Sequence, residues 1–349
     1  MATSRSQRQV IEDLTRTYGP EVAAAFDEAM LDLRSRAEVR RVVEALSRGD
    51  IEAALRALHI DEAAFERLSE AIATAHAEGG RAAVGFLPRR APDGTALVVR
   101  FRAGDPIAAY WLREHSARLV SRITGEVRDV IRDQLAEAMQ AGRPPQAAAI
   151  EIVGRVNRAT GRREGGVLGL TDPQAQAVRR AREELASTDP TALRSYLTRG
   201  RRDRRFDRTV ERAIRDGTPI PTETRRRMIR AYESRLLELR GQVIGRTEAM
   251  TALQRGANEA WRQAIADGKV DVQAVTKVWH ATRDLRTRDT HAILHGTSVG
   301  FNEPFVTARG ALMMHPMDTS LGAGRDEIIN CRCWVSYRVD AFSNYRRAA

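Results

Sequence analysis

The sequence predicts a mainly α-helical protein that ends in a small α+β domain. The 349 residues are 42% hydrophobic and 30% charged but only 5% aromatic, and they are rich in Ala, Arg, Leu and Glu, which favour helices. Apolar residues recur at helical spacing over most of the first 268 residues. Short apolar pieces separated by Gly and Pro follow them. An all-β fold is therefore not expected, and the length favours two or three structural units.

The first eighty residues predict an acidic helical bundle. A helix is expected from Pro20, followed by helices over residues 41–48, 51–58 and 61–77. Residues 81–104 are expected to form a linker, because glycines and prolines crowd residues 79–94 and mark the clearest break in the pattern. A short strand is expected at residues 96–102.

Residues 105–268 predict a helical scaffold. Asp105 and Pro106 are suited to the N-cap and first turn of a long amphipathic helix that reaches Gly142. A second helix is expected to start after Pro145. Further helices are expected over residues 173–186, 190–199, 206–216 and 221–267, without strands between them. Trp111 and Trp261 lie on these helical patterns and are expected to anchor the core or an interface.

Charge is distributed unevenly along the chain. The net charge is +11, yet residues 1–80 carry 10 basic and 15 acidic residues, whereas residues 194–246 carry 16 basic and 7 acidic ones. This Arg-rich region predicts a surface for phosphate. A solvated helix face crossed by ion pairs, or a coding bias towards arginine, remains an alternative. The predicted DNA-binding residues are Arg199, Arg201, Arg202, Arg204, Arg205, Arg208, Arg225, Arg226 and Arg227.

Residues 269–349 predict the α+β domain and contain most of the residues suited to chemistry. Four of the seven histidines and both cysteines lie between His280 and Cys333. We expect a strand at residues 277–281, a helix from residue 284 to residue 295 that ends before Gly296, and a strand at residues 329–338.

A zinc site is one hypothesis for this domain. Its ligands would be His291, His295, Cys331 and Cys333, since zinc favours imidazole and thiolate. However, two cysteines at alternate positions of a strand would hold their thiols roughly 6.6 Å apart. The alternative is that the cysteines serve as small buried hydrophobes while His295 lies at a helix C-terminus. No other cofactor is expected.

Other chemistry has little support in the sequence. The two cysteines cannot supply a disulfide framework, which indicates a reducing compartment. The N-terminal residues resemble no signal peptide, and no run of 18 uncharged apolar residues predicts a membrane span. Zinc-protease, P-loop and nucleophile-elbow motifs are absent from the sequence, so no catalytic residue is expected.

The C-terminal motifs resemble the phage Mu F-like family of minor head proteins, also called phage head morphogenesis proteins. The resemblance rests on residues 279–291, on the Asn330-Cys331-Arg332-Cys333 run, and on Arg246-Thr247-Glu248, which looks like that family's Arg-Thr-Glu helix. Met317 stands where the family tends to place Gly, and His295 is not reliably a histidine in it. The matching residues are Arg246, Glu248, Trp279, Asp284, Arg286, Arg288, His291, Gly296, Pro316, Asn330, Cys331 and Cys333.

This resemblance implies a non-enzymatic minor capsid protein of a tailed phage or prophage. Such a protein would dock on the portal inside the head, contact packaged double-stranded DNA non-specifically, and meet major capsid or scaffolding proteins, with no membrane partner. It would reside in the host cytoplasm during assembly and then in the virion, near the portal. The alternatives are a host DNA-binding regulator, a metal-dependent nuclease or an ADP-ribosyl transferase-like phage effector, although the Glu-x-Glu or Gln-x-Glu pair of such transferases is absent.

Overall fold

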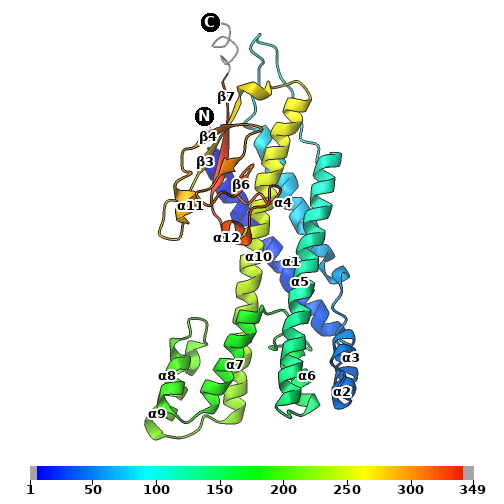
Figure 1. The fold of residues 1–349 in the computed structure, drawn as a ribbon, viewed down its shortest axis with the longest axis vertical. Coiled ribbons are helices and arrows are strands. Elements are labelled where there is room, and N and C mark those ends of the chain that lie inside the picture. Colours follow the sequence, from blue (N-terminus) through cyan, green and yellow to red (C-terminus); the bar gives the residue numbers. More distant parts are fainter. Residues whose placement is uncertain (1–5, 341–349) are drawn as a thin grey trace. The chain divides into compact units, whose positions relative to one another are not determined.

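A computed structural model describes residues 6–340 and confirms the mainly α-helical class (Figure 1). Helices make up 61% of the protein, and small antiparallel sheets lie towards the C-terminal end of the chain. None of the helices in the described range combines the length and the apolar character needed to cross a bilayer.

The described chain divides into two compact units, of which the first is assembled from three segments and the second from two. Unit 1 comprises residues 6–25, 68–116 and 242–340, and unit 2 comprises residues 26–67 and 117–241. The divisions fall inside four helices, which are α1 (Gln7–Arg36), α4 (Glu66–Val84), α5 (Pro106–Gln140) and α10 (Thr222–Ala266). Each compact unit therefore combines segments that are far apart in the sequence.

Two N-terminal helices, α1 and α4, are longer than the sequence predicts, whereas the helix expected over residues 51–58 ends at Arg56. Helix α1 starts well before Pro20 and continues through it, and α4 continues through Gly79 and Gly80. A Cβ atom on Gly79 would lie 2.2 Å from the carbonyl oxygen of Leu253, so this glycine permits close helix packing and does not end a helix. The expected strand at residues 96–102 is also wrong, since only an isolated bridge between Arg90 and Ala96 forms there.

Unit 2 contains the remaining N-terminal helices and most of the predicted scaffold helices. Local signals bound several of these helices: Gln174 accepts the Thr171 amide at the start of α7, and the left-handed Gly217, with φ of 61°, ends α9. The antiparallel pair β1–β2 was not predicted. The elements are α2 (Val39–Ser47), α3 (Ile51–Arg56), η1 (Glu62–Phe65), α6 (Pro145–Val153), β1 (Arg155–Val156), β2 (Arg163–Glu164), α7 (Asp172–Ala186), α8 (Pro190–Thr198), η2 (Arg204–Phe206) and α9 (Asp207–Asp216).

Unit 1 contains a three-stranded antiparallel sheet in the order β4-β3-β7. Trp261 of α10 and Trp279 of β3 are among its largest fully buried side chains, which agrees with the expected anchoring role of Trp261. The elements after α10 are η3 (Val272–Ala274), β3 (Val275–His280), α11 (Asp289–Ala292), β4 (Ser298–Gly300), β5 (Phe305–Val306), β6 (Leu312–Met313), α12 (Arg325–Ile328) and β7 (Trp334–Val339).

Two predicted elements of this region are shorter in the structure. The helix expected over residues 284–295 is reduced to the single turn α11, because the Asp284 carboxylate binds the Arg332 guanidinium and the amide of Arg286 at the start of this segment. The strand expected from residue 329 starts at Trp334. Asn330 has φ of 57°, a left-handed conformation that interrupts an extended strand.

Candidate functional site

Three hollows lined by arginine lie on unit 2. Their volumes are about 270, 420 and 460 Å³. The first and second share Glu164 and Arg230, and the second and third share Asp203 and Arg205, so the three hollows are neighbours. Twelve arginines and five acidic residues line them, which are Arg155, Arg158, Arg182, Arg201, Arg202, Arg204, Arg205, Arg225, Arg226, Arg227, Arg230 and Arg235 together with Glu151, Glu164, Asp203, Glu233 and Glu238.

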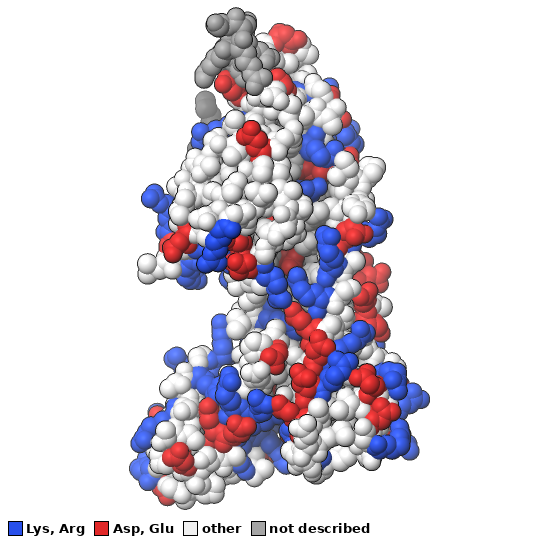
Figure 2. Space-filling view, viewed as in Figure 1, with Lys and Arg blue, Asp and Glu red and all other residues white. Residues whose placement is uncertain are grey.

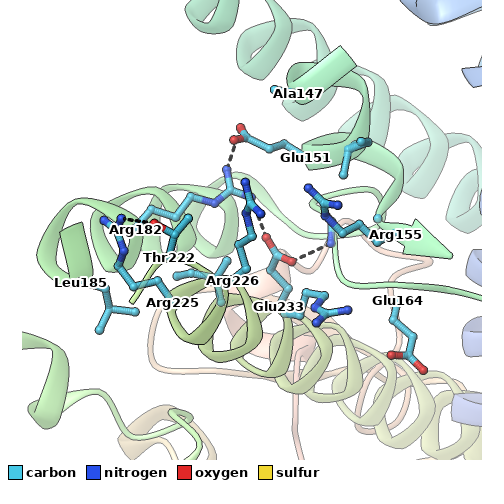
Figure 3. A pocket seen from close by; sticks show the side chains of 15 residues that line it. Ala147, Glu151, Arg155, Glu164, Arg182, Leu185, Thr222, Arg225, Arg226 and Glu233 are labelled. Atoms are coloured by element: carbon cyan, nitrogen blue, oxygen red, sulfur yellow. Dashed lines mark hydrogen bonds and ion pairs between the residues drawn. The ribbon is translucent and has the colours of Figure 1, made fainter. Parts of the chain in front are cut away.

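The first hollow is organised around a buried ion pair (Figure 3). Arg182 lies between two carboxylates, with its Nη1 3.0 Å from Glu151 Oε2 and its Nη2 2.7 Å from Glu233 Oε1. Glu233 also accepts the amide of Gly166 at 2.7 Å. Burial raises the pKa of Glu233, and the charge of Arg182 opposes this rise.

The predicted DNA-binding arginines fall into two groups. Arg199 lies 2.7 Å from Glu184, Arg202 lies 2.8 Å from Asp207 and Arg205 lies 2.7 Å from Asp203. Hydrogen bonds from Arg205 lower the pKa of Asp203 to about 2. These three arginines are therefore already neutralised by carboxylates, as the ion-pair alternative expects.

The other arginines carry positive charge that is not balanced by a close carboxylate. Within residues 6–340, no carboxylate lies within 4.0 Å of Arg201, Arg204, Arg208, Arg225 or Arg227. Arg226 lies 3.5 Å from Glu223. Figure 2 accordingly shows carboxylates scattered among the arginines of the unit that contains α8 and α9, and not a uniformly basic face.

Sequence reasoning missed several arginines of these hollows. Arg155, Arg158 and Arg182 precede the Arg-rich region, and Arg230 and Arg235 lie within it but were not selected. The sequence gives little indication that these arginines line a hollow. The pair β1–β2 was not predicted, and charge density alone does not show which helical arginines face a hollow.

A second candidate site lies in unit 1, where three predicted metal ligands meet. His291 Nδ1 lies 3.4 Å from Cys331 Sγ and 3.5 Å from Cys333 Sγ, and none of the three residues is more than 2% exposed. The three ligand atoms all lie within 4.8 Å of one another. His295 is outside this group, since its Nδ1 accepts the amide of Ala281. We refer to His291, Cys331 and Cys333 as the His–Cys cluster.

The backbone around the cysteines explains why the thiols are close. Cys331 and Cys333 precede β7, so the strand spacing of roughly 6.6 Å expected from the sequence does not apply to them. Thr247 Oγ1 accepts the amide of Asn330 at 3.1 Å. Gln254 donates to the carbonyl of Cys333 at 2.7 Å and accepts the amide of Val335 at 3.3 Å. Two side chains of α10 thus hold the turn in place.

The electrostatics of the His–Cys cluster favour one thiolate. A hydrogen bond from Cys331 lowers the pKa of Cys333, and the same bond raises the pKa of the Cys331 thiol. The Cys333 amide points to Cys331 Sγ at 3.4 Å. On the other side of the imidazole, His291 Nε2 lies 2.9 Å from Glu327 Oε2, although the two atoms are not aligned for a hydrogen bond.

Comparison with known families bears on both sites. Residues 191–336 match the family model described as phage Mu protein F like protein. This region belongs to the phage Mu protein F-like family. No curated protein and no solved structure gives a significant match to the chain. The match covers less than half of the chain, and the family that it identifies is one of bacteriophage head-morphogenesis proteins.

The motif residues of the Mu F-like region fall into a connected network in unit 1. Trp279 packs edge-on against His291, with ring centres 5.3 Å apart. Arg288 donates to the carbonyl of Ile329 at 2.6 Å. Asp284 forms a two-pronged ion pair with Arg332 at 2.5 and 2.6 Å, and this pair lowers the pKa of Asp284. These contacts fasten the segment before α11 to the segment before β7.

The other motif residues have separate roles. Glu248 is buried and lies 2.7 Å from His115 Nε2, whereas Arg246 is exposed. Gly296 has φ of 83° and donates its amide to the carbonyl of Trp279. Pro316 accepts from His315 Nδ1 through its carbonyl oxygen at 3.0 Å. Arg286 lies 3.6 Å from Asp284 at the surface.

Met317 shows why the family position before Asp318 tends to be glycine. Its φ is 67°, in the left-handed region that glycine adopts without strain. The Met317 side chain is nonetheless fully buried. The burial of an apolar side chain compensates here for an unfavourable backbone conformation.

Proposed function

We propose that the protein is a minor capsid protein that docks on the portal inside the phage head and contacts the packaged DNA without reading its sequence. The neighbouring arginine-lined hollows of unit 2 are the observation that carries the DNA part of the proposal. Membership of residues 191–336 in the Mu F-like family supports the role in the head.

The hollows suit phosphate better than bases. Guanidinium groups bind phosphate oxygens through paired N–H donors, and contacts of this kind carry no sequence information. Arginines without a close carboxylate gain most from phosphate, because they lose no existing ion pair when they bind it. The hollow-lining Arg201, Arg204 and Arg227 meet this condition, whereas Arg199, Arg202 and Arg205 do not.

The DNA contact is tested by the salt dependence of binding to two duplexes of unrelated sequence. Each phosphate that the protein neutralises contributes about −0.9 to the slope of log K against log salt. Replacement of the hollow-lining Arg201, Arg204 and Arg227 by Gln is expected to make the slope less negative by up to about 3. The matched control replaces Arg48, Arg56 and Arg180, which are exposed residues of unit 2 outside the hollows. No duplex binding at low salt, or equal losses in both triple variants, would contradict the proposal.

Portal docking is supported by the family and by exposed apolar side chains on α5. Ile107 and Tyr110 are 49% and 59% exposed and lie three residues apart, on one helix face. If this face docks, cross-linking in procapsids followed by mass spectrometry is expected to join unit 1 to the portal. The Ile107→Glu/Tyr110→Glu variant is expected to be depleted from particles. Cross-links only to major capsid or scaffolding protein, or unchanged incorporation of the variant, would exclude this mode of docking.

A further inference from the structure

We propose that the His–Cys cluster binds one zinc ion through His291 Nδ1, Cys331 Sγ and Cys333 Sγ, and that Glu327 positions the imidazole. This proposal is independent of DNA binding and of portal docking, since it concerns only residues of unit 1.

The distances in the cluster match a tetrahedral zinc site. Zinc lies about 2.3 Å from thiolate sulfur and about 2.0–2.1 Å from imidazole nitrogen, so two such ligands at tetrahedral angles are separated by about 3.5 Å. The observed separations between His291 Nδ1 and the two sulfur atoms are 3.4 and 3.5 Å. The described conformation therefore needs little rearrangement to accept the ion.

Glu327 supplies the outer partner that metal-binding histidines commonly have. Its carboxylate lies 2.9 Å from His291 Nε2, on the side of the ring opposite to the thiols, and Thr290 Oγ1 donates to the same oxygen at 2.9 Å. Glu327 is only 2% exposed, and within residues 6–340 neither its Oε1 nor His291 Nε2 has a hydrogen-bond partner. With zinc on Nδ1, the proton of the imidazole must lie on Nε2, where a small rotation would direct it to Glu327.

The protein also supports the thiol side of the site. The Cys333 amide lies 3.4 Å from Cys331 Sγ, in the position of a hydrogen bond to a metal-bound thiolate. Thr247 and Gln254 of α10 hold the backbone of residues 330–335. A buried cluster of this kind requires charge compensation, and a divalent cation balances two thiolates.

The site has three protein ligands. Among the described residues, no fourth His, Cys, Asp or Glu joins the group, and His295 is engaged by the amide of Ala281. The fourth position of the tetrahedron therefore belongs to water. Because the ligands come from α11 and from the segment before β7, the ion would connect these two parts of the fold.

Cobalt substitution of the full-length protein tests the proposal. The protein is reduced, treated with a chelator and titrated with Co²⁺, and zinc affinity is then measured by competition with a chromophoric chelator. We expect one equivalent of metal, visible bands of tetrahedral Co²⁺ and a thiolate-to-cobalt charge-transfer band, with absorption-edge spectroscopy of the zinc form showing two sulfur ligands. The wild-type spectra alone decide the question, so the test does not depend on the folding of a variant.

Variants then assign the ligands. Cys331→Ser, Cys333→Ser and His291→Ala are expected to lose the bands, and the matched control His295→Ala is expected to retain them. Glu327→Gln is expected to keep the stoichiometry while affinity falls about 10–100-fold. Failure of the folded, reduced protein to take up metal would overturn the proposal. Equal loss of the cobalt bands in His295→Ala would also overturn the proposal. The same holds if the two cysteines only form a disulfide when the protein is exposed to air.

Discussion

His76 is a single residue whose burial links stability to pH. It is fully buried, its ring lies 5.6 Å from that of Trp111 and 5.9 Å from that of Phe101, and neither ring nitrogen has a hydrogen-bond partner within the described chain. Burial, aided by the positive charge of Arg255, lowers the pKa of His76 to about 4. The folded state therefore keeps His76 neutral at pH values where the unfolded chain binds a proton.

The pH dependence follows from this difference. The unfolded pKa is 6.5, so the unfolded state binds more protons between pH 6.5 and about 4, and stability falls as pH decreases through this window. His76→Phe keeps a ring but cannot titrate. Urea unfolding should show that the free energy of unfolding of the wild type falls by about 2 kcal/mol more than that of the variant between about pH 7 and pH 5. A stability difference that is the same at both pH values would contradict this assignment.

Glu233 is a second residue with a strong predicted effect. Its carboxylate is buried and holds Arg182 and the Gly166 amide. Glu233→Ala leaves the buried Gly166 amide without its acceptor and leaves Arg182 with Glu151 alone, so it should cost about 1–3 kcal/mol in free energy of unfolding. Glu233→Gln should cost less, since an amide oxygen still accepts from Gly166. The exposed Glu164→Gln serves as the control in the same denaturation series, and equal losses in all three variants would refute the argument.

At the scale of elements, glycines explain one failure of sequence interpretation and give a prediction. The sequence places a break at Gly79, whereas in the structure α4 passes α10 closely at this point. A Cβ atom on Gly256 would lie 2.0 Å from the carbonyl oxygen of His76, and one on Gly79 would lie 2.2 Å from that of Leu253. A glycine within a helix suggests a helix break when only the sequence is considered, but in the structure it allows two helices to pack closely.

Alanine substitution separates these two roles of helical glycine. Gly79→Ala and Gly256→Ala each place a methyl group against the backbone of the neighbouring helix, which cannot move aside. Each substitution should therefore lower the free energy of unfolding by about 1–3 kcal/mol. Gly125 of α5 has no atom within 4 Å of a Cβ position, so Gly125→Ala should raise stability by about 0.5–1 kcal/mol. Thermal unfolding of the three variants measures both signs, and a stabilised Gly79→Ala protein would contradict the close packing.

Helices were more predictable than strands and sites, for physical reasons. Capping residues such as Asp105 and Asp189 act within one turn, so local sequence is enough to place α5 and α8. The turn at Asn330 depends on Thr247, which is 83 residues away in sequence. The sequence therefore indicated His291, Cys331 and Cys333 as ligands but did not indicate Glu327, whose role comes only from its position beside the imidazole.

At the scale of the whole molecule, each unit draws on distant parts of the chain. Helix α10 contributes its first half to unit 2 and its second half to unit 1, and the Mu F-like region 191–336 has residues in both. The consecutive segments expected from the sequence, 1–80, 81–104, 105–268 and 269–349, remain a prediction about pieces that fold independently. Composition shows where the proportions of residue types change along the chain. A boundary between units that falls inside a long helix needs no such change, so composition does not reveal it.

This division yields a prediction for the two proposed ligands. The arginine-lined hollows lie wholly in unit 2, and the His–Cys cluster and its supporting side chains lie wholly in unit 1. In hydrogen-exchange mass spectrometry of the full chain, duplex DNA should protect residues 199–208 and 225–235, whereas zinc should protect residues 281–295 and 326–335. Local binding raises the free energy of opening only where the ligand contacts the fold. The Cys333→Ser variant should lose the zinc effect and keep the DNA effect, and loss of both would show that the two sites are not independent.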